Sequence, residues 1–209
     1  CGSEYLMNSL KNEKAIYIPN AIDFEQPQFQ PQPQEKKGYT IGYVAGANHH
    51  LDCERLFKPL DILRQKNKDY NILVGGVAKD AISSDYWNYI LNIFTSNGLL
   101  PKERLFKIEA LDPYNYAVQY NYVDCLLAPL NNDQYSRCKS NIKVLEAGAF
   151  GLPIICSNVT PYQEFIFKGL VYELGSKVDD LMLSLIKNPG KGRKMGKALH
   201  EYVKENYNI

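Results

Sequence analysis

The residues best placed to do chemistry lie in the stretch 139–157, KSNIKVLEAGAFGLPIICS. The spacing i, i+4, i+7 places Lys139, Lys143 and Glu146 on one polar stripe of a predicted helix. The stripe starts near the helix N-terminus, where unbonded N–H groups and the helix dipole favour an anion. Two interpretations are open. The stripe is either a solvated Lys–Glu pair, worth about 0.2–0.5 kcal/mol, or a site that binds an anionic ligand.

The helix that carries this stripe is defined by its opposite face and by its end. Ile142, Leu145 and Ala149 recur at i, i+3, i+7, which is the spacing of one apolar helix face. Residues 151–153 (GLP) end the helix, because Gly tolerates unusual φ and Pro cannot continue a helix. Residues 154–155 then begin a short β-branched strand. The stretch therefore predicts a helix, a tight turn and a buried strand.

Strands alternate with helices along the rest of the chain. Strands are expected at 16–18, 40–46, 70–76, 104–111, 123–130 and 170–174, and helices at 51–66, 84–97, 176–187 and 191–206, with short helical turns after 112 and within 158–166. This alternation predicts the α/β class, with a doubly wound, mostly parallel sheet and helices on both faces. The turn after residues 40–46 lacks G-x-G-x-x-G, so dinucleotide binding is not supported.

A longer segment around the Lys–Glu helix carries a family resemblance. Residues 139–166, KSNIKVLEAGAFGLPIICSNVTPYQEFI, resemble the donor-site helix of glycosyltransferases with the GT-B architecture of two Rossmann-like domains, in particular the family-4-like group (glycosyl transferases group 1). Residues 15–23, AIYIPNAID, resemble the segment by which these enzymes pass from their first to their second domain. The resemblance covers residues 15–205. It implies the C-terminal, Rossmann-like half of a GT-B fold, which binds the nucleotide-sugar donor.

The resemblance assigns roles to the polar stripe. In that family, the Glu matching Glu146 binds the ribose hydroxyls of a nucleotide sugar, and the Lys matching Lys143 serves the diphosphate together with the helix N-terminus. Many members carry a second Glu eight residues earlier, which contacts the sugar. Cys138 stands at that position here. The sequence assigns no catalytic residue.

Further donor-binding candidates come from loops that follow strands, because ligands of open α/β sheets lie at the carboxyl ends of the strands. In the family, the turn at 46–50 lies beside the donor phosphates, although helix-start residues in solvent remain the alternative for His49 and His50. The loop after strand 104–111 contacts the nucleobase through its backbone, with ordinary strand-end packing as the alternative. The predicted donor-binding residues are Gly46, Asn48, His49, Arg137, Lys139, Ser140, Lys143 and Glu146, with Ala110 and Leu111 for the nucleobase.

Composition limits the partners. The chain has 209 residues, 45% hydrophobic and 22% charged, with net charge +1, so one globular domain is expected and nucleic acid is not indicated as a partner. No apolar run is long enough to predict a membrane span, and no signal-peptide pattern is present. Five scattered cysteines without C-x-x-C spacing predict a reduced, cytoplasmic protein without a zinc site. Neither a metal nor a cofactor besides the donor substrate is expected.

The predicted organisation has four parts. Residues 1–23 are read as the end of an N-terminal domain with the crossover, 24–37 as a Pro/Gln surface linker, 38–190 as the nucleotide-sugar-binding domain and 191–209 as a C-terminal helix. The chain is expected to be an excised part, inactive alone, of an enzyme that moves a hexose to a glycan or lipid-linked acceptor in bacterial surface polysaccharide synthesis, with peripheral membrane association of that enzyme a further expectation. A GT-B-fold nucleotide-sugar epimerase and a non-catalytic nucleotide- or protein-binding module are the alternatives.

Overall fold

A computed structural model describes residues 2–32, 34–78, 81–95 and 100–209. Its centre is a six-stranded sheet in the order β3-β2-β1-β4-β5-β6, in which every neighbouring pair is parallel. The strands are β1 Tyr39–Val44, β2 Tyr70–Val77, β3 Leu105–Glu109, β4 Cys125–Ala128, β5 Ile154–Cys156 and β6 Tyr172–Glu173. The α-helices are α1 Glu4–Ser9, α2 Glu54–Lys66, α3 Ala81–Thr95, α4 Gln134–Arg137, α5 Ile142–Ala149, α6 Thr160–Phe167, α7 Val178–Lys187 and α8 Pro189–Asn206.

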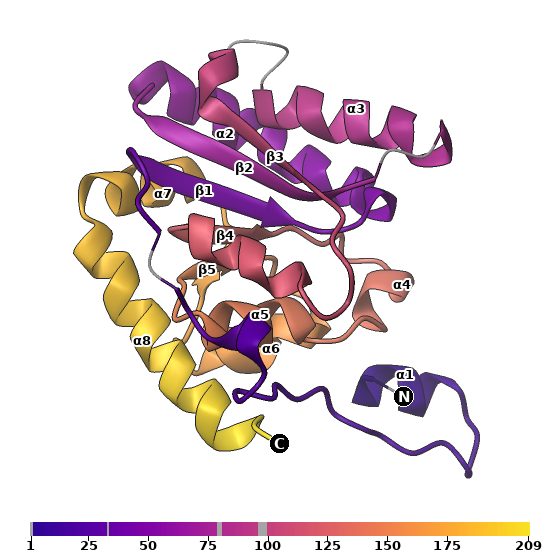
Figure 1. The fold of residues 1–209 in the computed structure, drawn as a ribbon. Helices are drawn as coiled ribbons and strands as arrows, with labels where there is room; N and C mark the ends of the chain where they lie inside the picture. The colour runs from indigo at the N-terminus through magenta and orange to yellow at the C-terminus, as the bar shows by residue number, and fades with distance from the viewer. Residues whose placement is uncertain (1, 33, 79–80, 96–99) are drawn as a thin grey trace.

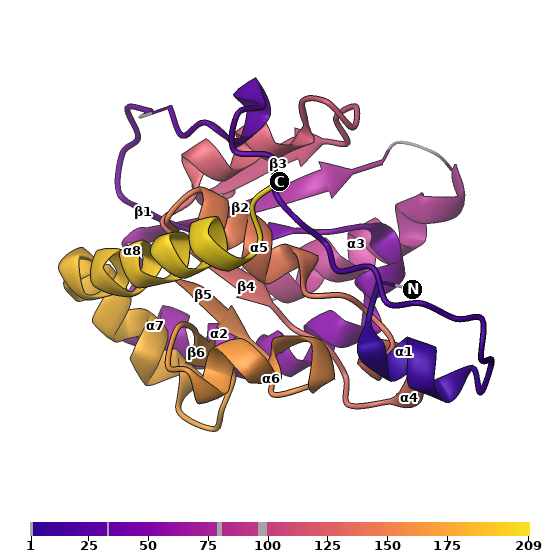
Figure 2. The ribbon, with the colours of Figure 1, turned by 90° about the horizontal axis from the view of Figure 1, so that it is seen from below.

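Helices cover both faces of the sheet (Figures 1 and 2). Side chains alternate between the faces along each strand, so Ile41 and Tyr43 of β1 join the core under α2, α3 and α7, whereas Val44 joins the opposite core. That second core packs against α5, α6, α8 and the 3-10 helix η5, Tyr116–Tyr122. The prediction of a doubly wound α/β fold is confirmed, and the sheet is parallel throughout.

The strand order fixes where a ligand can approach. The chain passes from β1 outward to β2 and β3 on one side, while β4, β5 and β6 extend the sheet on the other side. β1 and β4 therefore flank the topological switch point, and their outgoing loops diverge at the carboxyl edge. A crevice at this place is where open α/β sheets bind ligands.

Helix α5 follows the predicted outline. Gly151 has φ +62°, its N–H bonds to the carbonyl of Gly148 at 3.0 Å, and the N–H of Leu152 bonds to the carbonyl of Ala147 at 2.9 Å. This is a Schellman ending, in which a left-handed Gly closes the helix. Strand β5 follows directly, so the predicted helix, turn and strand are all present.

Several local expectations differ from the structure. Residues 16–18 form no strand: Ile16 and Ile18 are exposed rather than packed in the sheet, and the segment makes an isolated bridge only further on, between Ile22 and Asn208. The segment 24–37 is not entirely a surface linker: the 3-10 helix η1, Pro27–Phe29, buries Phe29, and the Gln28 side chain donates to the carbonyl of Pro113 at 3.2 Å.

Two helices also differ from the expected lengths. Helix α6 has eight residues where one short turn was expected, and α8 begins at Pro189 rather than at residue 191. The end of the expected helix 84–97 lies outside the described residues. Within the part of the chain that the structure describes, no helix is long and apolar enough to cross a membrane.

Candidate functional site

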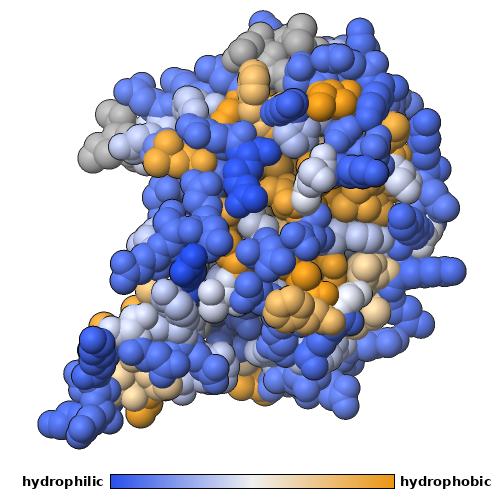
Figure 3. All heavy atoms as spheres, turned by 180° about the vertical axis from the view of Figure 1, so that it is seen from behind, coloured by the Kyte–Doolittle hydropathy of each residue, from blue (hydrophilic) through white to orange (hydrophobic). Residues whose placement is uncertain are grey.

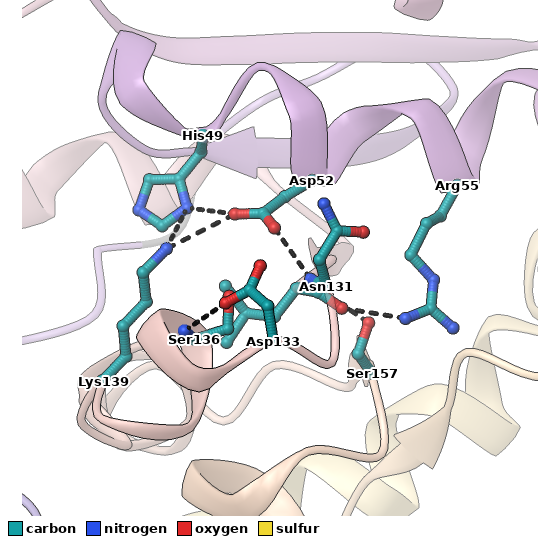
Figure 4. Close-up of polar contacts among 9 residues, drawn as sticks. His49, Asp52, Arg55, Asn131, Asp133, Ser136, Lys139 and Ser157 are labelled. Carbon is teal, nitrogen blue, oxygen red and sulfur yellow. Dashed lines mark hydrogen bonds and ion pairs between the residues drawn. The ribbon is translucent and has the colours of Figure 1, made fainter. Parts of the chain in front are cut away.

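The loops after β1 and β4 meet at the carboxyl edge of the sheet (Figure 4). The first loop contains the 3-10 helices η2, Ala47–His49, and η3, Leu51–Cys53. The second contains α4, whose first turn is capped where Asp133 accepts from the N–H of Ser136 at 2.7 Å. Polar side chains from both loops face one another at this switch point.

Asp52 joins the two loops. Its Oδ2 accepts from His49 Nδ1 at 2.8 Å and from Lys139 Nζ at 3.4 Å, and its Oδ1 accepts from the backbone N–H of Asn131 at 2.7 Å (Figure 4). The Asp52 side chain is 8% exposed. A single buried carboxylate thus ties together the segments after β1, after β4 and before α5.

The charges of this cluster are mutually stabilising. Burial by itself would raise the pKa of Asp52, but the hydrogen bonds from His49 and Asn131 and the charge of Lys139 outweigh it, so the pKa lies below its ordinary value. Asp52 is therefore an anion at neutral pH and a firm acceptor. With the Nδ1 proton of His49 donated to Asp52, the Nε2 nitrogen is left on the side away from the carboxylate. The ammonium group of Lys139 then stands beside this imidazole at the sheet edge, where an ammonium group suits phosphate oxygens.

A second layer fixes the loop after β4. The N–H of Leu130 donates to Ser157 Oγ at 2.9 Å, and Arg55 Nη1 donates to the carbonyl of Leu130 at 2.9 Å. Arg55 comes from α2, whereas Ser157 follows β5 (Figure 4). Both backbone groups of Leu130 are therefore held by side chains of neighbouring units, which fixes the path of the loop that carries Asn131.

The Lys143–Glu146 pair is largely buried rather than solvated. The Glu146 side chain is 3% exposed and that of Lys143 is 24% exposed, and Lys143 Nζ lies 3.1 Å from Glu146 Oε2. The hydroxyls of Tyr116 and Tyr120 donate to Glu146 Oε1 and Oε2 at 2.7 Å and 2.5 Å. The interpretation as a pair on a solvated helix face is therefore wrong. The Glu146 carboxylate is therefore held in one position within α5 by its hydrogen-bond donors.

The predicted polar stripe of three residues is also wrong in one member. Helix α5 begins at Ile142, so Lys139 lies in the preceding turn and not on the helix. Its ammonium group turns toward His49, 3.1 Å from Nδ1, and lies over the Tyr135 ring at 4.9 Å. The two lysines consequently belong to two separate clusters that flank the start of α5.

The start of α5 keeps backbone donors free of a side-chain cap. Asn141 at the N-cap makes no capping bond, and its carbonyl instead accepts from the N–H groups of Val144 and Leu145 at 2.9 Å and 3.2 Å. The first backbone N–H groups of a helix have no partner within the helix, and they lie at the positive end of the helix dipole. Together they can bind an anion. Ser140 lies beside this end and is half-buried.

A cavity of about 340 Å³ adjoins this helix start. It lies between the N-terminal segment and the first turns of α5 and α6, and its lining includes Ser3, Tyr17, Lys139, Ser140, Asn141 and Glu164. The Ser3 hydroxyl donates to the carbonyl of Cys138 at 2.9 Å, which seats α1 against the loop. The surface is hollowed above the projecting N-terminal segment (Figure 3).

The remaining predicted residues are placed less centrally. Arg137 Nε donates to Asn132 Oδ1 at 2.9 Å within its own loop. Gly46 and Asn48 are exposed in the turn after β1. The nucleobase candidates Ala110 and Leu111 are exposed just beyond β3, and the N–H of Ala110 is already bonded to the carbonyl of Val77 at 3.0 Å. Only carbonyls and the Leu111 N–H of that pair are therefore candidates for a ligand.

His50 does not share the surroundings of His49. Its ring stacks on Tyr86 of α3 with centroids 4.3 Å apart, and it is half-buried. The alternative that both histidines are simple helix-start residues in solvent is therefore wrong. Among the residues that the structure describes, no three His, Cys, Asp or Glu side chains gather as a metal-binding group.

Several residues of the site were not found from the sequence. Asp52 follows His49 at i+3, a spacing at which side chains on a helical turn meet, so this signal was present in the sequence. Asn131 acts through its backbone, and Tyr116 and Tyr120 reach Glu146 from 30 and 26 residues away. No local pattern marks such long-range partners.

Comparison with known proteins identifies the fold. No protein-family model matches the chain, and no curated protein matches it by sequence. Among solved structures, a glycosyltransferase from Rickettsia africae has a TM-score of 0.69 at 14% identity, covering 99% of this chain and 58% of that chain. The C-terminal domain of a glycosyl transferase group 1 family protein from Francisella tularensis has a TM-score of 0.66 at 16% identity, covering 90% of this chain and 99% of that domain.

A trehalose-6-phosphate synthase has a TM-score of 0.65 at 13% identity, covering 91% of this chain and 48% of that chain. The chain thus spans about half of two of these proteins and nearly the whole of the isolated C-terminal domain. Its fold is that of the C-terminal, Rossmann-like half of GT-B glycosyltransferases.

Proposed function

We propose that this chain is the donor-binding half of a glycosyltransferase and binds a nucleoside-diphosphate sugar at the start of α5. The observation that carries this proposal is the uncapped N-terminus of α5, flanked by Lys139 and Lys143, at the switch point of a sheet with a GT-B fold. Each lysine carries three N–H donors, so donors remain beyond the one that faces its carboxylate, and these together with the helix N-terminus suit the oxygens of a diphosphate.

The same groups explain how transfer would be assisted. When the bond between the sugar and the diphosphate breaks, negative charge grows on the leaving diphosphate. Lys143, Lys139 and the helix N–H groups would stabilise that charge more strongly in the transition state than in the bound donor. Glu146 would hold the ribose hydroxyls, which orients the donor without taking part in bond breaking. Arg137, Ser140, Gly46 and Asn48 would complete the phosphate and sugar surroundings.

The rest of the reaction belongs to a second domain. We assign residues 1–23 to the crossover, 24–37 to the connection, 38–190 to the donor domain and 191–209 to the closing helix. The complete enzyme would transfer a hexose to a glycan or lipid-linked acceptor in surface polysaccharide synthesis. It would act in the cytoplasm with peripheral attachment to a membrane. The acceptor site would come from the other domain, so the 209-residue chain alone is expected to bind donor without transferring sugar.

Isothermal titration calorimetry of the chain with UDP, GDP and ADP tests donor binding. One of the three should bind with a Kd of about 1 mM or tighter, and Lys139→Ala and Lys143→Ala should each weaken it by about tenfold. Lys187→Ala, at the far end of α7, is the matched control and should leave binding unchanged. A chain that melts cooperatively but binds none of the three would contradict the proposal.

The ribose role of Glu146 is separable from the phosphate role of the lysines. Glu146→Gln keeps the side-chain volume and should weaken the preferred nucleoside diphosphate by about tenfold, while inorganic pyrophosphate binding should change little. Melting temperature should be recorded for both proteins so that loss of fold is recognised. An equal loss for both ligands would remove the ribose assignment and leave the phosphate assignment standing.

A further inference from the structure

The Glu146 carboxylate is held by three donors at once. Tyr116 donates to Oε1 at 2.7 Å, while Tyr120 donates to Oε2 at 2.5 Å and Lys143 lies 3.1 Å from the same oxygen. A carboxylate offers about four lone-pair positions. Three are therefore occupied, and the one left over belongs to Oε1, the oxygen that Tyr116 covers.

This occupancy matters for a ribose, which presents two neighbouring hydroxyls as donors. One hydroxyl could use the spare position, but a second needs a protein donor to withdraw. Glu146 is also 2% exposed, so the carboxylate offers almost no surface to a sugar ring in this arrangement. A side chain above it has to move before both ribose hydroxyls can reach the carboxylate.

With Lys143 kept beside Oε2 and its other N–H donors on the diphosphate, the donor that withdraws is a tyrosine, and burial indicates which one. Tyr120 has no exposed surface and packs against the Phe150 ring with centroids 5.4 Å apart. Tyr116 is only half-buried and stands at the first position of η5. It follows a tight turn in which Asp112 accepts from the N–H of Tyr114 at 2.9 Å. Tyr116 can rotate outward at the cost of its own contacts, whereas Tyr120 cannot leave without opening the core.

We propose that Tyr116 is a latch on the ribose pocket: in the ligand-free domain its hydroxyl occupies Glu146 Oε1, and the ribose of a bound nucleoside diphosphate takes its place. This inference rests on the proposed function and extends it to the movement that admits the ligand. The exchange replaces one hydroxyl donor by another, so Glu146 stays satisfied in both states. Because Tyr116 follows the turn that adjoins Ala110 and Leu111, arrival of the base and release of the latch are coupled along one segment.

This exchange makes the site selective for ligands that carry both ribose hydroxyls. A ligand with both hydroxyls replaces the bond that Tyr116 gives up, whereas a 2′,3′-dideoxy analogue offers Glu146 no donor and leaves Tyr116 in place. Inorganic pyrophosphate leaves the latch closed, because it does not reach the ribose pocket. The three ligands therefore report on different parts of the site.

Tyr116→Phe tests the latch, because it removes the competing hydroxyl and keeps the ring. In calorimetry, the preferred nucleoside diphosphate should bind about three- to tenfold more tightly to this variant. Its 2′,3′-dideoxy analogue and inorganic pyrophosphate should bind as they do to the unmodified chain. Tyr122→Phe, an exposed tyrosine of the same helix, is the matched control and should change none of the three affinities. Unchanged or weaker binding of the nucleoside diphosphate to Tyr116→Phe would overturn the latch.

A second measurement uses the unmodified chain and does not depend on the variant's folding. Hydrogen–deuterium exchange of residues 112–118 should change on addition of the nucleoside diphosphate and stay constant with pyrophosphate. If the nucleotide binds and this segment does not respond, the latch is wrong while the donor site stands. If no nucleotide binds the unmodified chain, the donor site itself fails.

Discussion

At the scale of single residues, Asp52 determines the geometry of the switch point. It holds an imidazole, an ammonium group and a backbone N–H that come from three segments of the chain. Removing a buried acceptor leaves its donors unsatisfied, which costs more than a hydrogen bond contributes on average. We therefore expect this carboxylate to matter for stability as well as for placing Lys139 and His49.

Asp52→Asn tests this role through its pH dependence. The variant should lower the free energy of unfolding by about 1–3 kcal/mol at pH 7, measured by urea denaturation. The pKa of Asp52 is lower in the folded protein than its ordinary value of 3.8. A carboxyl group of this kind contributes stability that is present above the unfolded pKa and is lost as pH falls through the folded pKa.

The stability difference between the two proteins should therefore be constant near neutrality and shrink below about pH 4. The other carboxyl groups with lowered pKa, Asp112 and Asp179, titrate in both proteins and cancel in the difference. A difference in unfolding free energy that stays constant down to the pH of acid unfolding would show that the charge of Asp52 contributes nothing to stability.

At the scale of elements, α8 positions α5 by close backbone approach. A Cβ on Gly196 of α8 would lie 1.9 Å from the carbonyl oxygen of Gly151, in the turn that ends α5. Gly148 likewise faces Val203, with 2.5 Å from a built Cβ to the nearest methyl group. Only residues without a side chain allow α8 to lie this close. The helix that presents Lys143 and Glu146 is thereby fixed from behind.

Gly196→Ala should lower the free energy of unfolding by about 1–3 kcal/mol or more, since the added methyl group meets backbone rather than a movable side chain. Gly190→Ala in the same helix is the matched control. Its Cβ would meet only the movable side chains of Asn188, at 3.3 Å, and Arg193, at 4.0 Å, and Ala is favoured over Gly in helices by about 1 kcal/mol. Thermal or urea unfolding of the two variants should differ in sign. Equal stability of both would contradict the close packing of α8 on α5.

The elements themselves were largely predictable, and the exceptions have physical causes. Strand β4 and helix α5 were found because a continuous apolar run and a 3.6-residue period are local signals. Residues 16–18 have the apolar, β-branched side chains of a strand, but Ile16 and Ile18 are exposed outside the sheet, and a short segment alone does not show whether it joins a sheet. The burial of Glu146 depends on tyrosines far along the chain. Local pattern therefore identified the stretch that carries the proposed site and misjudged how deeply its carboxylate lies.

At the scale of the whole molecule, the segment that leads to the sheet is tied at Ile22 to the residues that follow α8. The N–H of Ile22 donates to the carbonyl of Tyr207 at 2.7 Å, and the N–H of Ile209 donates to the carbonyl of Ile22 at 3.3 Å. The Tyr207 hydroxyl donates to Glu164 Oε2 at 2.8 Å, and the Ile22 side chain is 1% exposed. The segment assigned to the crossover is thus anchored to the domain by residues that follow α8.

Deleting residues 207–209 should release this anchor. The amide of Ile22 should exchange with deuterium as fast as an exposed amide, and the free energy of unfolding should fall by about 1–3 kcal/mol, because two backbone bonds and a buried side chain lose their partners. Tyr207→Phe is the control, since it removes the bond to Glu164 and keeps the backbone bridge, so Ile22 should stay protected. Should Ile22 remain protected in the truncated chain, the crossover must be held by its own contacts, and the closing helix would have no part in setting the path between the two halves of the proposed enzyme.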